Sequence, residues 1–251
     1  MYRILPLLLL IVLWSCSEDN EDKINPAFEG DVVLSTQQEV DDFADQGITE
    51  ISGDLTIESE LDASIAITSL EGLSNLVRVD GDVLIQRNNR LSDLKGLSNL
   101  VRVEGDISIR RNNWLSDLKG LSNLVHVDGS VSIFRNNLLS DLAGLEQLST
   151  IGGRLSISSN DNLTNIQHLS SLTSIGSLLE IQYNEDLREI NDFNNLVDIG
   201  DAIEIAGNPQ LLSIDGFEAL ETIPTHLLVW SNVLLEQING FSKLSSIGRD
   251  F

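Results

Sequence analysis

Short apolar segments recur along the chain at a fixed interval of 24 residues. In the unit around residue 84, Val83 and Ile85 are apolar while Asp82 and Gln86 are polar, which is the period of two of a half-buried strand. Both columns stay apolar in every later unit, so each unit is predicted to add one rung to a stacked parallel sheet. The first column contains Val83, Ile107, Val131, Leu155, Leu179, Ile203 and Leu227. The second contains Ile85, Ile109, Ile133, Ile157, Ile181, Ile205 and Val229.

An asparagine follows each of these strands, where the chain has to turn a corner. Its amide has two donors and an acceptor with two lone pairs, so it can satisfy the backbone groups that such a corner buries. Leaving one of these groups unpaired costs about 1–3 kcal/mol. We therefore predict a structural ladder between rungs. It contains Asn88, Asn112, Asn136, Asn160, Asn184, Asn208 and Asn232.

A second pattern surrounds the strands, with the form Leu-x-x-Ile-x-Gly-x-Leu-x-Ile at residues 148–157. This run resembles the receptor L-domain, the leucine-rich solenoid of insulin- and epidermal-growth-factor-type receptors. The resemblance covers about residues 31–251. It implies a right-handed, leucine-rich-repeat β-solenoid of 24-residue rungs that acts as an extracellular, non-catalytic recognition scaffold. Because the chain lacks the cysteines of the animal receptors, their ligand residues are not carried over to this sequence.

Residues 36–46 are predicted to form one short helix that caps the first rung. Thr36 and Glu39 have the spacing of a capping box, and Gly47 can adopt the left-handed conformation that ends a helix. Solenoids need end caps, because an open end exposes both the core and a strand edge. The predicted apolar face of the helix contains Val40, Phe43 and Ala44.

Two further features refine the repeat. The first unit is offset from the second by 28 residues, which places Glu60 in the ladder column. A glycine column on the opposite side predicts turns, since glycine adopts positive φ readily, with His168 and Asp192 as departures. The column contains Gly72, Gly96, Gly120, Gly144, Gly216 and Gly240.

The N-terminal sequence predicts where in the cell the protein is located. Residues 1–15 combine one cation, an apolar run and a small residue, which is the order of a secretory signal. The segment that ends at Cys16 resembles a bacterial lipobox, which implies a lipid anchor at Cys16. Residues 16–30 begin with an acidic stretch predicted to be a flexible tether. That stretch is similar to the surface-export signal of Bacteroidetes lipoproteins, which implies an outer-membrane protein exposed on the cell surface.

Charge and cysteine content exclude several classes of function. The net charge of −24 argues against nucleic acid as a partner, because phosphate binding needs clustered Lys and Arg. Cys16 is the single cysteine, so the chain can form neither an internal disulfide nor a thiolate metal site. At the other end Phe251 falls in the strand column. We therefore expect the sequence to be a truncated or excised part of a longer protein.

The strand face offers a candidate binding surface. Columns starting at residues 82, 84 and 86 are predicted to point outward, and stacking about 4.8 Å apart turns each column into a row. Arginines beside aromatic residues suit carboxylate- or sulfate-bearing glycans and peptide hot spots. Alternatively, duplicated units carried these arginines along, with Asp82 and Asp106 offsetting their charge. The candidate residues are Arg87, Arg110, Arg111, Arg135, Phe134, Tyr183 and Trp230.

Enzymatic chemistry has weak support in the sequence. Asp80, Glu104 and Asp128, with Asp82 and Asp106, form an acidic row that could bind calcium or simply be a solvated corner. No Ser-His-Asp set, metal-type His pair or phosphate loop is present, so we predict no enzyme, no cofactor and no metal. We expect a lipid-anchored module that binds a glycan or protein through its strand face. A passive spacer or adhesin segment is the alternative, and a carbohydrate-active enzyme is the third.

Overall fold

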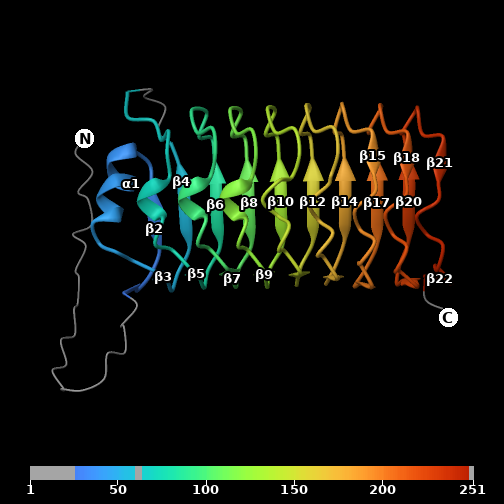
Figure 1. Cartoon of the computed structure of the whole chain (residues 1–251), viewed down its shortest axis with the longest axis horizontal. Helices are drawn as coiled ribbons and strands as arrows, with labels where there is room; N and C mark the ends of the chain where they lie inside the picture. Colours follow the sequence, from blue (N-terminus) through green and yellow to red (C-terminus); the bar gives the residue numbers. More distant parts are fainter. Residues whose placement is uncertain (1–25, 60–63, 249–251) are drawn as a thin grey trace, which may run out of the picture.

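A computed structural model describes residues 26–59 and 64–248 of the chain. The described chain winds into a right-handed parallel β-solenoid of about nine turns, which confirms the predicted fold class and the 24-residue rung. Figure 1 shows the turns side by side along one axis, with a helix at the N-terminal end.

The longer strands form a nine-stranded sheet, here called the main sheet. Each strand pairs in parallel with the strands one turn before and one turn after it, so Val131 lies between Ile107 and Leu155. The first full turn is longer, since Leu55 pairs with Val83 at an offset of 28. The strands are β2 Val32–Leu34, β4 Leu55–Glu58, β6 Val83–Gln86, β8 Ile107–Arg110, β10 Val131–Phe134, β12 Leu155–Ser158, β14 Leu179–Gln182, β17 Ile203–Ala206 and β20 Leu227–Trp230.

Two-residue strands complete the other sides of each turn. An eight-stranded sheet contains β1 Ala27–Phe28, β3 Glu50–Ile51, β5 Arg78–Val79, β7 Arg102–Val103, β9 His126–Val127, β11 Thr150–Ile151, β13 Ser174–Ile175 and β16 Asp198–Ile199. Smaller sheets contain β15 Glu189–Ile190, β18 Ser213–Ile214 and β21 Gln237–Ile238, and the pair β19 Thr222–Ile223 and β22 Ser246–Ile247. Three 3₁₀ turns are η1 Glu71–Leu73, η2 Lys95–Leu97 and η3 Lys119–Leu121.

The core runs the length of the solenoid between these sheets. Both predicted apolar columns are buried through β17, while Leu227 and Val229 of the last main strand are half-buried. Leucines from the return segments fill the opposite side, and three phenylalanines replace them in the last turns. Phe217 stacks between Phe193 and Phe241 at centroid distances of 5.1 and 4.7 Å.

The asparagine ladder is confirmed. Its members from Asn88 to Asn208 have no exposed surface. The Asn136 amide donates to the Ile109 carbonyl at 2.9 Å, and its Oδ1 accepts from the Asn112 backbone N–H at 3.1 Å. Ser59 begins the ladder, because its N–H and hydroxyl both donate to Asn88 Oδ1, at 2.8 and 2.9 Å. Glu60, predicted for this column, lies outside the described residues.

A second ladder, formed by aspartates, precedes the main strands. The backbone N–H of Asp82 donates to Asp54 Oδ1 at 2.8 Å, and that of Asp106 donates to Asp82 Oδ1 at 2.7 Å. A glycine precedes each aspartate because a Cβ at Gly81 would lie 2.2 Å from the Asp54 carboxylate oxygen. These aspartates therefore hold adjacent turns together, a role that the sequence pattern did not reveal.

The predicted N-terminal helix is confirmed with small changes of extent. Helix α1 spans Gln37–Ala44, and both hydrogen bonds of the Thr36–Glu39 capping box are present. Val40 and Phe43 are buried against the first turns, whereas Ala44 is exposed rather than part of the packed face. The boundary between tether and solenoid was wrong. Strand β1 already pairs with β3 at residues 27–28, inside the predicted tether.

The predicted turns are confirmed at Gly72, Gly96, Gly120 and Gly144, although a positive φ is not what glycine supplies at most of these positions. The members of the glycine column in the 3₁₀ turns do not have positive φ, and in this column only Gly144 among the glycines has it, at φ 116°. The reason for glycine is close approach, since a Cβ at Gly96 would lie 1.6 Å from the Leu70 carbonyl oxygen. His168 occupies the same column with φ 83°.

Candidate ligand-binding groove

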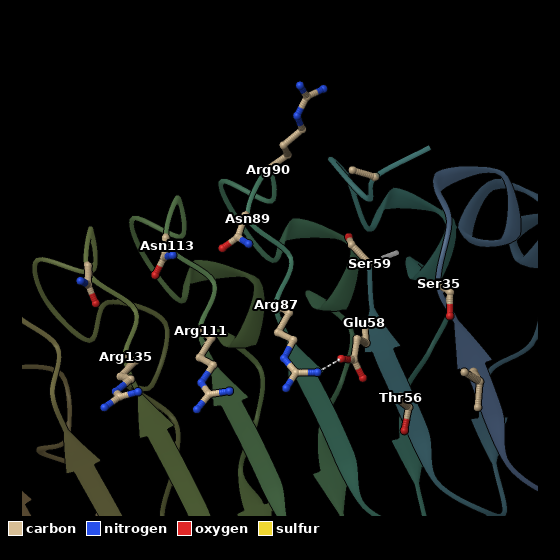
Figure 2. A pocket seen from close by; sticks show the side chains of 13 residues that line it. Ser35, Thr56, Glu58, Ser59, Arg87, Asn89, Arg90, Arg111, Asn113 and Arg135 are labelled. Atoms are coloured by element: carbon tan, nitrogen blue, oxygen red, sulfur yellow. Dashed lines mark hydrogen bonds and ion pairs between the residues drawn. The ribbon is translucent and has the colours of Figure 1, made fainter. Parts of the chain in front are cut away.

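A groove of about 840 Å³ lies at the carboxyl ends of the first main-sheet strands. Arg87, Arg111 and Arg135 stand in one row along it, and Figure 2 shows these side chains projecting from successive strand ends. A second row, from the following loops, contains Asn89, Asn113 and Asn137. Ser35, Thr56, Glu58 and Ser59 line the end nearest the helix.

Each arginine in the row has a left-handed backbone. The φ angles of Arg87, Arg111 and Arg135 are 57°, 58° and 55°. Non-glycine residues in this region store about 1–3 kcal/mol of strain and persist only where neighbours enforce them. Here the backbone N–H of each arginine donates a hydrogen bond to a carbonyl of the next rung, which holds the conformation. The N–H of Arg111, for example, donates to the Phe134 carbonyl at 3.0 Å. The kink lets the following asparagine enter the core while the arginine faces solvent.

This backbone state is shared by the whole column and was missed in the sequence. The remaining members are Ser159, Tyr183, Gly207 and Ser231, with φ between 54° and 65°. The available signal was the glycine at position 207, because glycine is the residue that adopts this conformation without strain. Six of the seven positions nevertheless carry a side chain, which the fold itself does not require.

The three arginines differ in electrostatic environment. Arg87 is paired with Glu58 at 2.7 Å (Figure 2). Among the described residues, neither Arg111 nor Arg135 has a carboxylate partner, and Arg135 lies 4.9 Å from the centroid of the Phe134 ring. The groove therefore presents two uncompensated guanidinium groups in a chain of net charge −24.

The predicted site residues do not all meet in the groove. Arg110 lies beside it, where its Nε donates to Gln86 Oε1 at 2.8 Å, and Gln86 in turn donates to Glu58 at 2.6 Å. Gln86 and Ala206 are buried, so the prediction that their column faces solvent throughout was wrong. Tyr183 and Trp230 are about half exposed and lie further along the strand face.

Asp80, Glu104 and Asp128 of the acidic row take part in ion pairs. Arg78 pairs with Asp80 at 2.7 Å and Glu104 at 2.6 Å, and these carboxylates, Asp80 first, raise the pKa of Arg78. Arg102 continues the network to Asp128. Within residues 26–59 and 64–248, no group of three or more His, Cys, Asp or Glu is placed to hold a metal ion.

The predicted signal, Cys16 and Phe251 all lie outside the described residues. In the part of the chain that the structure covers, no helix combines the length and apolar character needed to cross a membrane. Comparison of the sequence with protein-family models and curated proteins, and with solved structures, finds no significant match.

Proposed function

We propose that this protein is a cell-surface recognition module whose groove binds an acidic glycan. The observation that supports this most directly is that the guanidinium groups of Arg111 and Arg135 have no carboxylate partner among the described residues. Arginine binds carboxylate and sulfate in bidentate fashion, with charge-assisted hydrogen bonds. Elsewhere on this acidic solenoid, arginines such as Arg78 and Arg102 are neutralised by neighbouring carboxylates.

The spacing of the groove favours a glycan over an acidic peptide. Successive rungs lie about 4.8 Å apart, so the arginine row repeats at about that interval. Side chains on one face of an extended peptide recur about every 6.6 Å, which does not match the row. A pyranose residue in an extended polysaccharide has a length comparable with the rung spacing. Acidic sugars could therefore place successive charges along the row.

The asparagine row adds hydroxyl recognition. The amides of Asn89 and Asn113 line the groove above the arginines (Figure 2). Each amide can both donate to and accept from a sugar hydroxyl, which a row of charges alone cannot do. Arg87 already forms an ion pair with Glu58, so we assign the main anion contacts to Arg111 and Arg135.

The proposed location rests on the N-terminal resemblance to a lipoprotein signal with Cys16 as anchor. A surface module tethered in this way would present its strand face to extracellular polysaccharide. The receptor L-domain resemblance supports the same role, because it implies non-catalytic recognition.

The test is calorimetric binding of polygalacturonate to the chain from Ser17 onward, which contains every described residue. Methyl-esterified polygalacturonate is the matched ligand without charge. We expect Arg111→Gly with Arg135→Gly to weaken binding about tenfold or more, and added salt to weaken it further. Glycine keeps the left-handed backbone, so this variant should unfold within about 1 kcal/mol of the parent.

The control is Lys95→Ala with Lys119→Ala, which removes the same charge from two exposed positions outside the groove lining. This control should bind like the parent. Equal weakening in both double variants would show a nonspecific charge effect and refute the groove. Absence of binding to polygalacturonate and to a sulfated glycan would favour a spacer without a ligand.

A further inference from the structure

A second candidate site lies on the strand face two turns beyond Arg135. Tyr183 occupies the left-handed column at φ 56°, and 49% of it is exposed. Gly207 stands in the same column one turn later, at φ 65°. A Cβ at Gly207 would lie 2.6 and 2.8 Å from Cδ1 and Cε1 of Tyr183. The tyrosine ring therefore lies across the next turn, in space that a side chain at position 207 would take.

Small residues lie between the ring and the next exposed aromatic side chain, and Ala206 among them has no exposed surface. Ala206 precedes Gly207 and pairs in register with Gln182 on one side and Trp230 on the other. Trp230 is 51% exposed. Tyr183 and Trp230 thus stand two turns apart, about 10 Å along the sheet, with the least bulky pair of neighbours between them.

Polar groups joined by hydrogen bonds lie beside these residues. Glu204 lies on the same face as Ala206, since it stands two positions before Ala206 in β17. Gln182 Nε2 donates to Glu204 Oε2 at 3.1 Å, and His226 Nε2 lies 3.1 Å from Glu204 Oε1. The Glu204 carboxylate offers acceptor capacity to hydroxyl donors, and its negative charge disfavours an anionic ligand.

We propose that Tyr183 and Trp230 form a platform for a neutral pyranose ring. The apolar C–H face of a sugar packs on an aromatic ring, whose polar edge remains in water, and bordering carboxylate and amide groups bind the hydroxyls. The site is independent of the arginine groove, because its ligand is uncharged and its residues lie on or directly after β14, β17 and β20. The occupant is a neutral polysaccharide, because the Glu204 carboxylate beside the platform repels acidic sugars.

The experiment is calorimetry and tryptophan fluorescence with the purified protein and hexasaccharides of glucose, mannose, galactose and xylose. We expect at least one hexasaccharide to bind, and Tyr183→Ala to weaken that binding about tenfold or more. Tyr183→Phe should retain most affinity, since the ring remains. Gly207→Ala should weaken binding because its methyl group displaces the ring.

The two sites are separated by cross-tests. Arg111→Gly with Arg135→Gly should leave hexasaccharide binding unchanged, and Tyr183→Ala should leave polygalacturonate binding unchanged. Circular dichroism of Tyr183→Ala must match the parent, and Tyr183→Phe provides the conservative comparison if it does not. No binding by any of the four hexasaccharides, or equal affinity of the parent and a folded Tyr183→Ala variant, would overturn the platform.

Discussion

Replacing Asn136 with alanine tests the ladder that supports every corner of the solenoid. The side chain has no exposed surface, and it serves two backbone groups, the carbonyl of Ile109 and the N–H of Asn112. Alanine removes both partners while the surrounding turns keep the backbone groups away from solvent. The loss is therefore that of two buried, unsatisfied groups.

Each such group costs about 1–3 kcal/mol, so Asn136→Ala should lower the free energy of unfolding by about 2–6 kcal/mol. Water entering the vacated space would recover part of this, which favours the lower half of the range. The neighbouring Asn137 provides the control. Its amide donates to Asp161 Oδ2 at 2.9 Å in an exposed contact, and Asn137→Ala should cost less than about 1 kcal/mol.

Urea unfolding followed by circular dichroism gives the comparison of the two variants. Because repeat arrays can open locally, hydrogen exchange should accompany it. The amide proton of Asn112 is expected to lose protection in Asn136→Ala and to keep it in Asn137→Ala. Equal stabilities, or a protected Asn112 amide in Asn136→Ala, would refute the assignment of the ladder as a structural support.

Three further substitutions test other parts of the packing. Gly120→Ala should destabilise by about 1–3 kcal/mol in urea, because a Cβ there would lie 1.7 Å from the Leu94 carbonyl oxygen; an unchanged midpoint would contradict the close approach. Phe217→Ala should lower the free energy of unfolding by about 3–5 kcal/mol, since the ring is fully buried between two others. A decrease as small as that of an ordinary surface substitution would contradict the stacking of the three rings. Thr36→Ala should cost about 0.5–2 kcal/mol by removing the bond to the Glu39 N–H, with faster hydrogen exchange confined to the first turns; uniform loss of protection would show that the cap acts globally.

The glycine column shows that one residue type can serve two structural roles. Glycine at positions such as 96 predicted a turn, which the structure confirms, but φ is not positive there and the missing Cβ allows the close approach of adjacent turns. Both roles need the absence of a Cβ, so a sequence pattern cannot separate them. The opposite holds in the column of left-handed residues that starts at Arg87. Positive φ occurs at Arg87 and Tyr183, residues that rarely adopt it, because hydrogen bonds between turns enforce it.

The repeat by itself determined the core, the rung length and the asparagine ladder. Every turn offers the same environment to a residue and to its counterpart 24 positions later, so periodicity is sufficient to place those columns. The capping box of α1 could also be predicted from the sequence, since it depends only on residues close together in the chain. These features depend on neighbours that the period or the local sequence specifies.

Only the tertiary structure decided which arginines are available to a ligand. Arg87 and Arg111 are identical residues in one column, but Glu58 pairs with Arg87 and no described carboxylate pairs with Arg111. The physical reason is that side-chain partners come from adjacent turns, where a single change from glutamate to glutamine, as from Glu58 to Gln86, alters the charge that each arginine meets. Likewise, the ring of Tyr183 occupies space that a side chain at position 207, one turn later, would take.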